Sequence, residues 1–161
     1  MLRFIVHAAA AVTMAVSTLA FADADPRATA ALAAMPAEIE GYTRSMDDMT
    51  DVSEEDKSVN VMRMLNSPKA NGPVILQVRL WTAEDTEADA EKMLDPDGLE
   101  ILKATIVDVN GYPAFFMPGA MAVYPGRPDS GVTVMVSGLT DSDEAARLAA
   151  LFDYDALLAI E

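Results

Sequence analysis

The stretch VDVNGYPAFFMP (Val107–Pro118) decides more about the fold than any other part of the sequence. Asn-Gly between two apolar-rich runs is the strongest short-range signal for a β-hairpin, because a type I′ turn needs positive φ at both central residues. Pro113 would then fall at a non-hydrogen-bonded pair, so its missing N–H removes no hydrogen bond from the hairpin. It does prevent Pro113 from donating a ladder bond to a third strand on the other side of residues 112–117. Counting outward from the turn predicts the pairs Val109–Tyr112, Asp108–Pro113, Val107–Ala114, Ile106–Phe115, Thr105–Phe116 and Ala104–Met117.

Alternating apolar and polar residues predict further strands on both sides of this hairpin. In residues 58–66, Val59, Val61 and Arg63 fall on one face, and Asn60, Met62 and Met64 fall on the other. Residues 58–66 and 73–82 are expected to pair as a hairpin whose Val/Leu face is core. The acidic residues 46–57 are expected to form a loop. The expected strands are residues 39–45, 58–66, 73–82, 104–109, 112–117, 120–124 and 132–137.

Two main helices are predicted, one over residues 84–94 and one over residues 140–152. Thr82 with Asp85, and Thr140 with Asp143, have the spacing of a capping box with Asp in place of Glu. Residues 153–160 indicate another short helical turn, and residues 23–36 indicate an Ala-rich helix. Strands joined by turns, with helices between and after them, predict an α+β fold with an antiparallel sheet of about 5–7 strands.

The first 22 residues have the features of a cleaved signal peptide. Arg3 precedes an apolar run, and Ala20-Phe21-Ala22 fits the small-residue rule for cleavage before Asp23. We therefore expect an exported protein, periplasmic or secreted, that is soluble after cleavage. Residues 23–37 would form an N-terminal arm, and residues 38–161 a single α+β domain.

The chain is strongly acidic, with 11 Lys and Arg against 26 Asp and Glu and a net charge of −15. Cleavage would remove Arg3 and no acid, leaving one more net negative charge. Such a charge argues against nucleic acid and anionic membrane surfaces as partners, because both require positive charge. The chain has no cysteine, so it must be stabilised by its core without disulfides.

The single histidine, His7, lies in the predicted signal peptide, so the mature chain would have neither His nor Cys. This composition excludes Ser-His-Asp and Cys-His catalysis and disfavours standard zinc and haem sites. We predict no catalytic, cofactor or standard metal residues. The leading hypothesis is a non-catalytic domain that binds a protein or a small ligand. One alternative is a hydrolase that uses two carboxylates, as glycosidases do.

Two small groups of residues remain candidates for binding. Met62 and Met64 project from one strand face, and thioethers suit Cu(I), which makes a Met-based copper carrier a further alternative. Met also fills cores, and that interpretation is preferred here. Gln77, Arg79 and Trp81 share a mixed strand face and could border a groove for a ligand or partner.

The hairpin and the segment after it are similar to a known pattern. Residues 107–114 carry V-x-V-x-G-x-x-A, and Val134-Met135-Val136-Ser137-Gly138 leads into the helix signal at Thr140. Over about residues 100–155 the chain resembles a family of small exported bacterial domains of unknown function. The resemblance implies an α+β periplasmic domain and carries over no functional residue.

Overall fold

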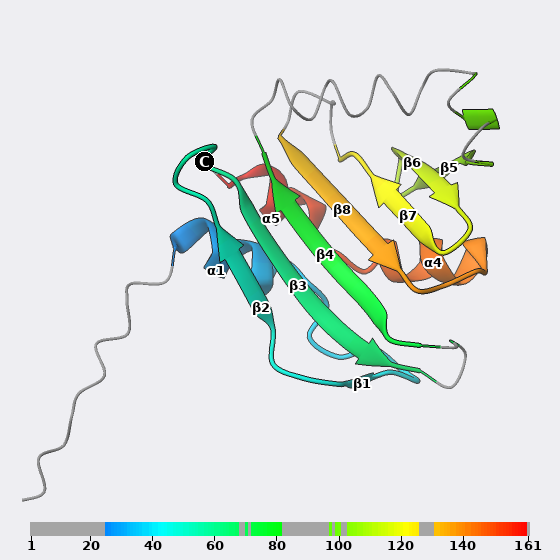
Figure 1. The fold of residues 1–161 in the computed structure, drawn as a ribbon, viewed down its shortest axis with the longest axis horizontal. Helices are drawn as coiled ribbons and strands as arrows, with labels where there is room; N and C mark the ends of the chain where they lie inside the picture. The colour runs from blue at the N-terminus through cyan, green and yellow to red at the C-terminus, as the bar shows by residue number, and fades with distance from the viewer. Residues whose placement is uncertain are drawn as a thin grey trace, which may run out of the picture.

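The computed structural model describes residues 25–67, 70, 72–81, 97, 99–100, 103–125 and 131–160. Its described part contains one antiparallel sheet of eight strands with three helices packed on one face, which confirms the α+β class (Figure 1). The strands are β1 (Thr43–Arg44), β2 (Met49–Val52), β3 (Val59–Asn66), β4 (Val74–Leu80), β5 (Thr105–Val109), β6 (Tyr112–Met117), β7 (Ala120–Val123) and β8 (Val132–Ser137).

The order of strands across the sheet is β1-β3-β4-β8-β7-β6-β5, with β2 also paired to β3. The helices are α1 (Pro26–Ala33), α4 (Ser142–Ala149) and α5 (Tyr154–Leu158). Helix α1 contacts β3 and α5, whereas α4 contacts β7, β8 and β5. The main core therefore lies between these helices and the sheet, behind the strands as Figure 1 is drawn.

The β5–β6 hairpin has the predicted register. Five of the six predicted Cα pairs, from Thr105–Phe116 to Val109–Tyr112, are present, and the predicted pair Ala104–Met117 is not part of the ladder. Asn110 and Gly111 have φ of 55° and 84°, as a type I′ turn requires. On the far side the β6–β7 ladder begins at Ala114 opposite Val123, and Pro113 only accepts a bond, from the N–H of Tyr124. Pro113 thus marks the end of that ladder.

The β3–β4 hairpin is also confirmed, and its alternation separates two faces. The helix-facing side chains of β4 are fully or nearly fully buried, and those on its other side are half-buried. The same alternation runs along β3, where Arg63 takes a core-facing position beside Val61 and Leu65. The Val/Leu face is core, as the sequence predicts.

The acidic segment 46–57 is not only a loop, because it contains β2. Its four residues pair with β3 from Met49–Met62 to Val52–Val59. Only Val52 packs against the core, so backbone pairing at the edge of the sheet stabilises a strand with little apolar pattern. The strand expected over residues 39–45 is reduced to β1, because a turn at Gly41 (φ 81°) interrupts it.

The helices differ from their predicted positions at the ends. Asp141, not Thr140, caps α4, and its carboxylate accepts the N–H groups of Asp143 and Glu144. The short C-terminal helix is confirmed as α5. Helix α1, which sequence analysis places in an arm, buries Ala28 and Ala31 in the core. The helix predicted over residues 84–94 lies outside the described residues.

Candidate functional site

The sheet has a second face, turned away from α1, α4 and α5, which we call the outer face. Residues directly opposite each other on paired strands share a face, so the registers define its members. They include Met49, Asp51, Asn60, Met62, Met64, Ile75, Gln77, Arg79, Ile106, Phe115, Ala120, Ala122, Thr133, Met135 and Ser137. A small cluster of Phe115, Ala122 and Tyr124, packed with Leu99 and Met135, covers the β6–β8 part of this face.

A polar row crosses three strands on the outer face. Asp51 of β2 lies opposite Asn60 of β3, and Asn60 lies opposite Arg79 of β4. Neighbouring strands are about 4.8 Å apart, so the row brings a carboxylate, an amide and a guanidinium together. Gln77, one position along the same face, donates from Nε2 to Oδ1 of Asn60 at 2.8 Å and fixes the amide.

Trp81 follows this row at the end of β4. The guanidinium carbon of Arg79 lies 3.8 Å from the centroid of a Trp81 ring, in cation–π geometry. The Trp81 backbone N–H donates to the carbonyl of Gly131 at 2.7 Å, which holds the residue beside β8. Gln77, Arg79 and Trp81 therefore lie on one face, and the partners that sequence reasoning missed are Asn60 and Asp51.

A hollow of about 380 Å³ opens at this point, and we call it the outer hollow. Its volume lies within the range of small-molecule sites. A smaller hollow of about 170 Å³ lies on the β7–β8 side of Arg79 and Trp81. The outer hollow is lined by Asp51, Asp56, Ser58, Val59, Asn60, Arg79 and Trp81.

Asp56 is fixed by the loop between β2 and β3. Ser58 donates to its Oδ1 from the backbone N–H at 3.1 Å and from the hydroxyl at 2.8 Å. Hydrogen bonds from Ser53 and Ser58 lower the pKa of the Asp56 carboxyl to about 2. It is therefore an ionised acceptor at neutral pH and unsuited to general-acid catalysis, which needs a raised pKa.

Helix α1 helps to hold this loop in place. Arg27 donates from Nη1 to the carbonyl of Lys57 at 2.8 Å, while its Nη2 pairs with the Asp25 carboxylate at 2.9 Å. Asp25 is also the cap of α1. One arginine thus connects the start of the helix to the wall of the outer hollow.

The methionines of the candidate copper site also lie on the outer face. Met62 and Met64 are half-buried on β3, and Met49 of β2 lies directly opposite Met62. Sequence reasoning counts Met49 among the methionines that could suit copper, but it places residues 46–57 in a loop and so does not bring Met49 beside Met62. Within the described ranges there is no group of three or more His, Cys, Asp or Glu side chains that could hold a metal.

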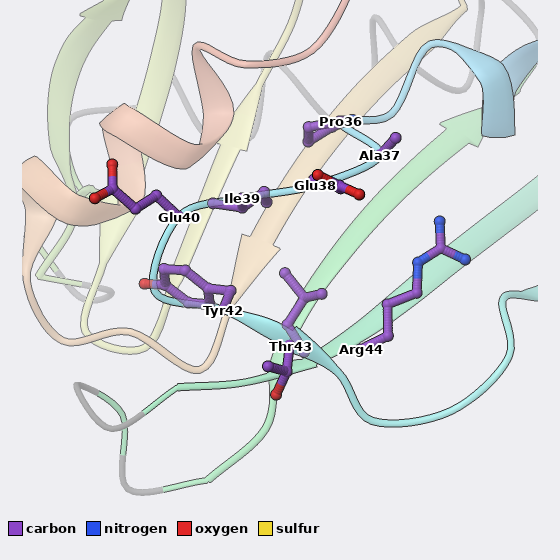
Figure 2. A pocket seen from close by; sticks show the side chains of 9 residues that line it. Pro36, Ala37, Glu38, Ile39, Glu40, Tyr42, Thr43 and Arg44 are labelled. Carbon is purple, nitrogen blue, oxygen red and sulfur yellow. The ribbon is translucent and has the colours of Figure 1, made fainter.

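A third hollow, of about 920 Å³, lies where α1 leads into β1, and we call it the loop hollow. Figure 2 shows residues 36–40 passing along one side and the chain returning through Tyr42, Thr43 and Arg44. The buried Ile39 and Tyr42 contribute apolar surface, whereas Glu38 and Glu40 are exposed. Its lining is completed by Pro36, Ala37 and Leu65.

Comparison with known proteins gives no relative: no family model, curated protein or solved structure matches this chain. Among the helices that the structure describes, none has the length and apolar character needed to cross a bilayer.

Proposed function

We propose that this protein is an exported, non-catalytic domain that binds a small polar ligand in the outer hollow. The observation that carries the proposal is the Arg79–Trp81 stack at the end of the Asp51–Asn60–Arg79 row. An aromatic surface beside a few convergent polar groups is the usual composition of a small-molecule site. The carboxylates, the amide and the Ser58 hydroxyl favour a ligand that carries hydroxyl or amino donors.

Export is the second part of the proposal. It rests on the apolar run after Arg3 and on Ala20 and Ala22, which fit the small-residue rule for cleavage before Asp23. Removal of residues 1–22 would leave α1 and its cap, Asp25, intact.

The tryptophan gives a direct test of binding, because Trp81 is the only tryptophan in the chain. Its emission would be recorded while chromatographic fractions of a low-molecular-weight extract of the producing cells are added. We expect one fraction to change the emission saturably in the wild type and not in Asn60→Ala. If no fraction changes the emission of the folded protein, small-ligand binding at this hollow is rejected.

Binding of Cu(I) is a second candidate function, favoured by one observation. Met49 lies opposite Met62, with Met64 on the same face, so thioethers from two strands are close together. Titration in competition with a colorimetric Cu(I) chelator should give sub-micromolar affinity that Met62→Leu weakens. Absence of sub-micromolar binding in the wild type would remove this candidate.

A further inference from the structure

The loop hollow is built by a turn that brings two extended arms together. The N–H of Tyr42 donates to the carbonyl of Ile39 at 3.0 Å, and Gly41 adopts φ of 81° inside this turn. The first arm, residues 36–40, leaves α1, and the second arm is β1, which pairs with β3. Figure 2 shows the two arms with the space of the hollow between them.

Both arms are held from outside the hollow, so its shape exists before any partner binds. Arg63 donates to the Pro36 carbonyl at 2.7 Å and to both oxygens of Asp48, which follows β1. The Tyr42 hydroxyl donates to Oε1 of Glu144 on α4 at 2.8 Å. A preformed site binds with a smaller entropic cost than one that must be ordered.

The chemistry of the hollow is an apolar floor with an acidic rim. The floor consists of the more exposed Pro36 and Ala37 together with the small exposed parts of Ile39, the Tyr42 ring and Leu65, which are 4–9% exposed. Glu38 and Glu40 stand exposed at the rim. Among the described residues of the lining Arg44 is the only base, against two acids, Glu38 and Glu40, so the net charge of the rim is negative.

We infer that the loop hollow docks an extended segment of a partner protein in which basic residues alternate with apolar ones. Lys or Arg side chains would meet Glu38 and Glu40, and apolar side chains would cover the apolar floor. The acidic net charge of the chain would also speed the encounter with a basic partner. The hollow, with more than twice the volume of the outer hollow, has room for several side chains of such a segment. This is a site separate from the outer hollow.

A fluorescently labelled peptide of alternating Lys and Leu tests the inference by anisotropy, using the mature chain at low ionic strength. We expect saturable binding that weakens about fivefold in the double variant Glu38→Gln/Glu40→Gln, as the loss of two exposed ion pairs implies. The matched control, Glu54→Gln/Glu55→Gln, removes the same charge from exposed positions of the β2–β3 loop and should weaken binding less than twofold.

A peptide without apolar side chains, the Asn60→Ala variant and competition by spermine provide three further tests of the inference. A peptide with Ser in place of Leu should bind at least fivefold more weakly, and Asn60→Ala should leave peptide binding unchanged. Equal weakening by the two charge variants, equal binding of the Ser peptide, or no saturable binding would each overturn the inference. Displacement of the peptide by equimolar spermine would also overturn it, because the site would then be one for small polycations.

Discussion

The carboxylate of Asp48 holds the guanidinium of Arg63 through two hydrogen bonds, from Nε at 2.9 Å and from Nη2. Arg63 is only 4% exposed, on the core face of β3, yet its charge is fully supplied with acceptors, because Pro36 also offers its carbonyl. This one side chain ties the start of the loop hollow, the segment after β1, and the sheet together.

Asp48→Asn should destabilise the protein by about 3 kcal/mol, because removing one partner of a buried pair leaves the other charge uncompensated. Urea unfolding at pH 7 would measure this against Asp47→Asn, an exposed neighbour whose substitution should change the free energy of unfolding by less than about 0.5 kcal/mol. Similar effects of the two substitutions would contradict the structural role of the pair.

The same pair predicts a pH dependence. The hydrogen bond from Arg63 lowers the pKa of the Asp48 carboxyl below its ordinary 3.8, against the opposing effect of burial. A carboxyl whose pKa is depressed on folding contributes stability above its unfolded pKa and loses it as the pH falls through the folded value. The difference in unfolding free energy between wild type and Asp48→Asn should therefore be constant from pH 7 to pH 5 and shrink below about pH 4.

The β5–β6 turn predicts a contrast between two glycines. Gly111 has φ of 84°, where a Cβ is strained, so Gly111→Ala should cost about 1 kcal/mol. Gly72 has open space around it and no positive φ, so Gly72→Ala should be neutral or slightly stabilising. Equal effects on the urea midpoint would contradict the type I′ turn.

The contact between Arg79 and Trp81 predicts an effect on quenching. Because the guanidinium covers one face of the ring at 3.8 Å, Arg79→Ala should increase the acrylamide quenching constant of Trp81 emission. Arg44→Ala, in the loop hollow, should leave it unchanged. An unaltered constant in Arg79→Ala would show that the stack does not persist in solution.

Processing at the N-terminus is predicted from the sequence. When the full chain is expressed in a bacterium, intact mass should show an exported product that begins at Asp23, since Ala20-Phe21-Ala22 fits the cleavage rule. Ala22→Trp should block cleavage, because the residue before the cut must be small. An unprocessed wild-type chain that stays in the cytoplasm would contradict the export proposal.

Local rules were sufficient for the hairpins. The Asn110–Gly111 turn fixes the pairing of β5 with β6 by counting alone, and alternation in β3 and β4 separates core from outer face. Local rules could not predict β2, because Met49–Val52 has almost no alternation of apolar residues and becomes a strand only by pairing with β3. The cap of α4 was misplaced by one residue, because Thr140 and Asp141 are both good capping residues and the backbone decides between them.

Only the part of the candidate site that lies on a single strand was predictable from the sequence. Period-two alternation places Gln77, Arg79 and Trp81 on one face, but Asp51 and Asn60 join them only through the order of β2, β3 and β4. The loop hollow depends on contacts between distant residues, such as Tyr42 with Glu144, which no local pattern reveals. Arg63 was the one signal in the sequence: alternation places it on the core face of β3, where a buried charge needs an acidic partner nearby.

Native mass spectrometry of the exported protein would detect a small molecule bound in the outer hollow. Wild type and Asn60→Ala would be recovered from the producing cells under non-denaturing conditions, with Thr43→Ala in the loop hollow as a control. We expect a small-molecule adduct of one defined mass on wild type and on Thr43→Ala, and its loss from folded Asn60→Ala. An adduct retained by Asn60→Ala, or no adduct on any of the three, would contradict a ligand site at the outer hollow.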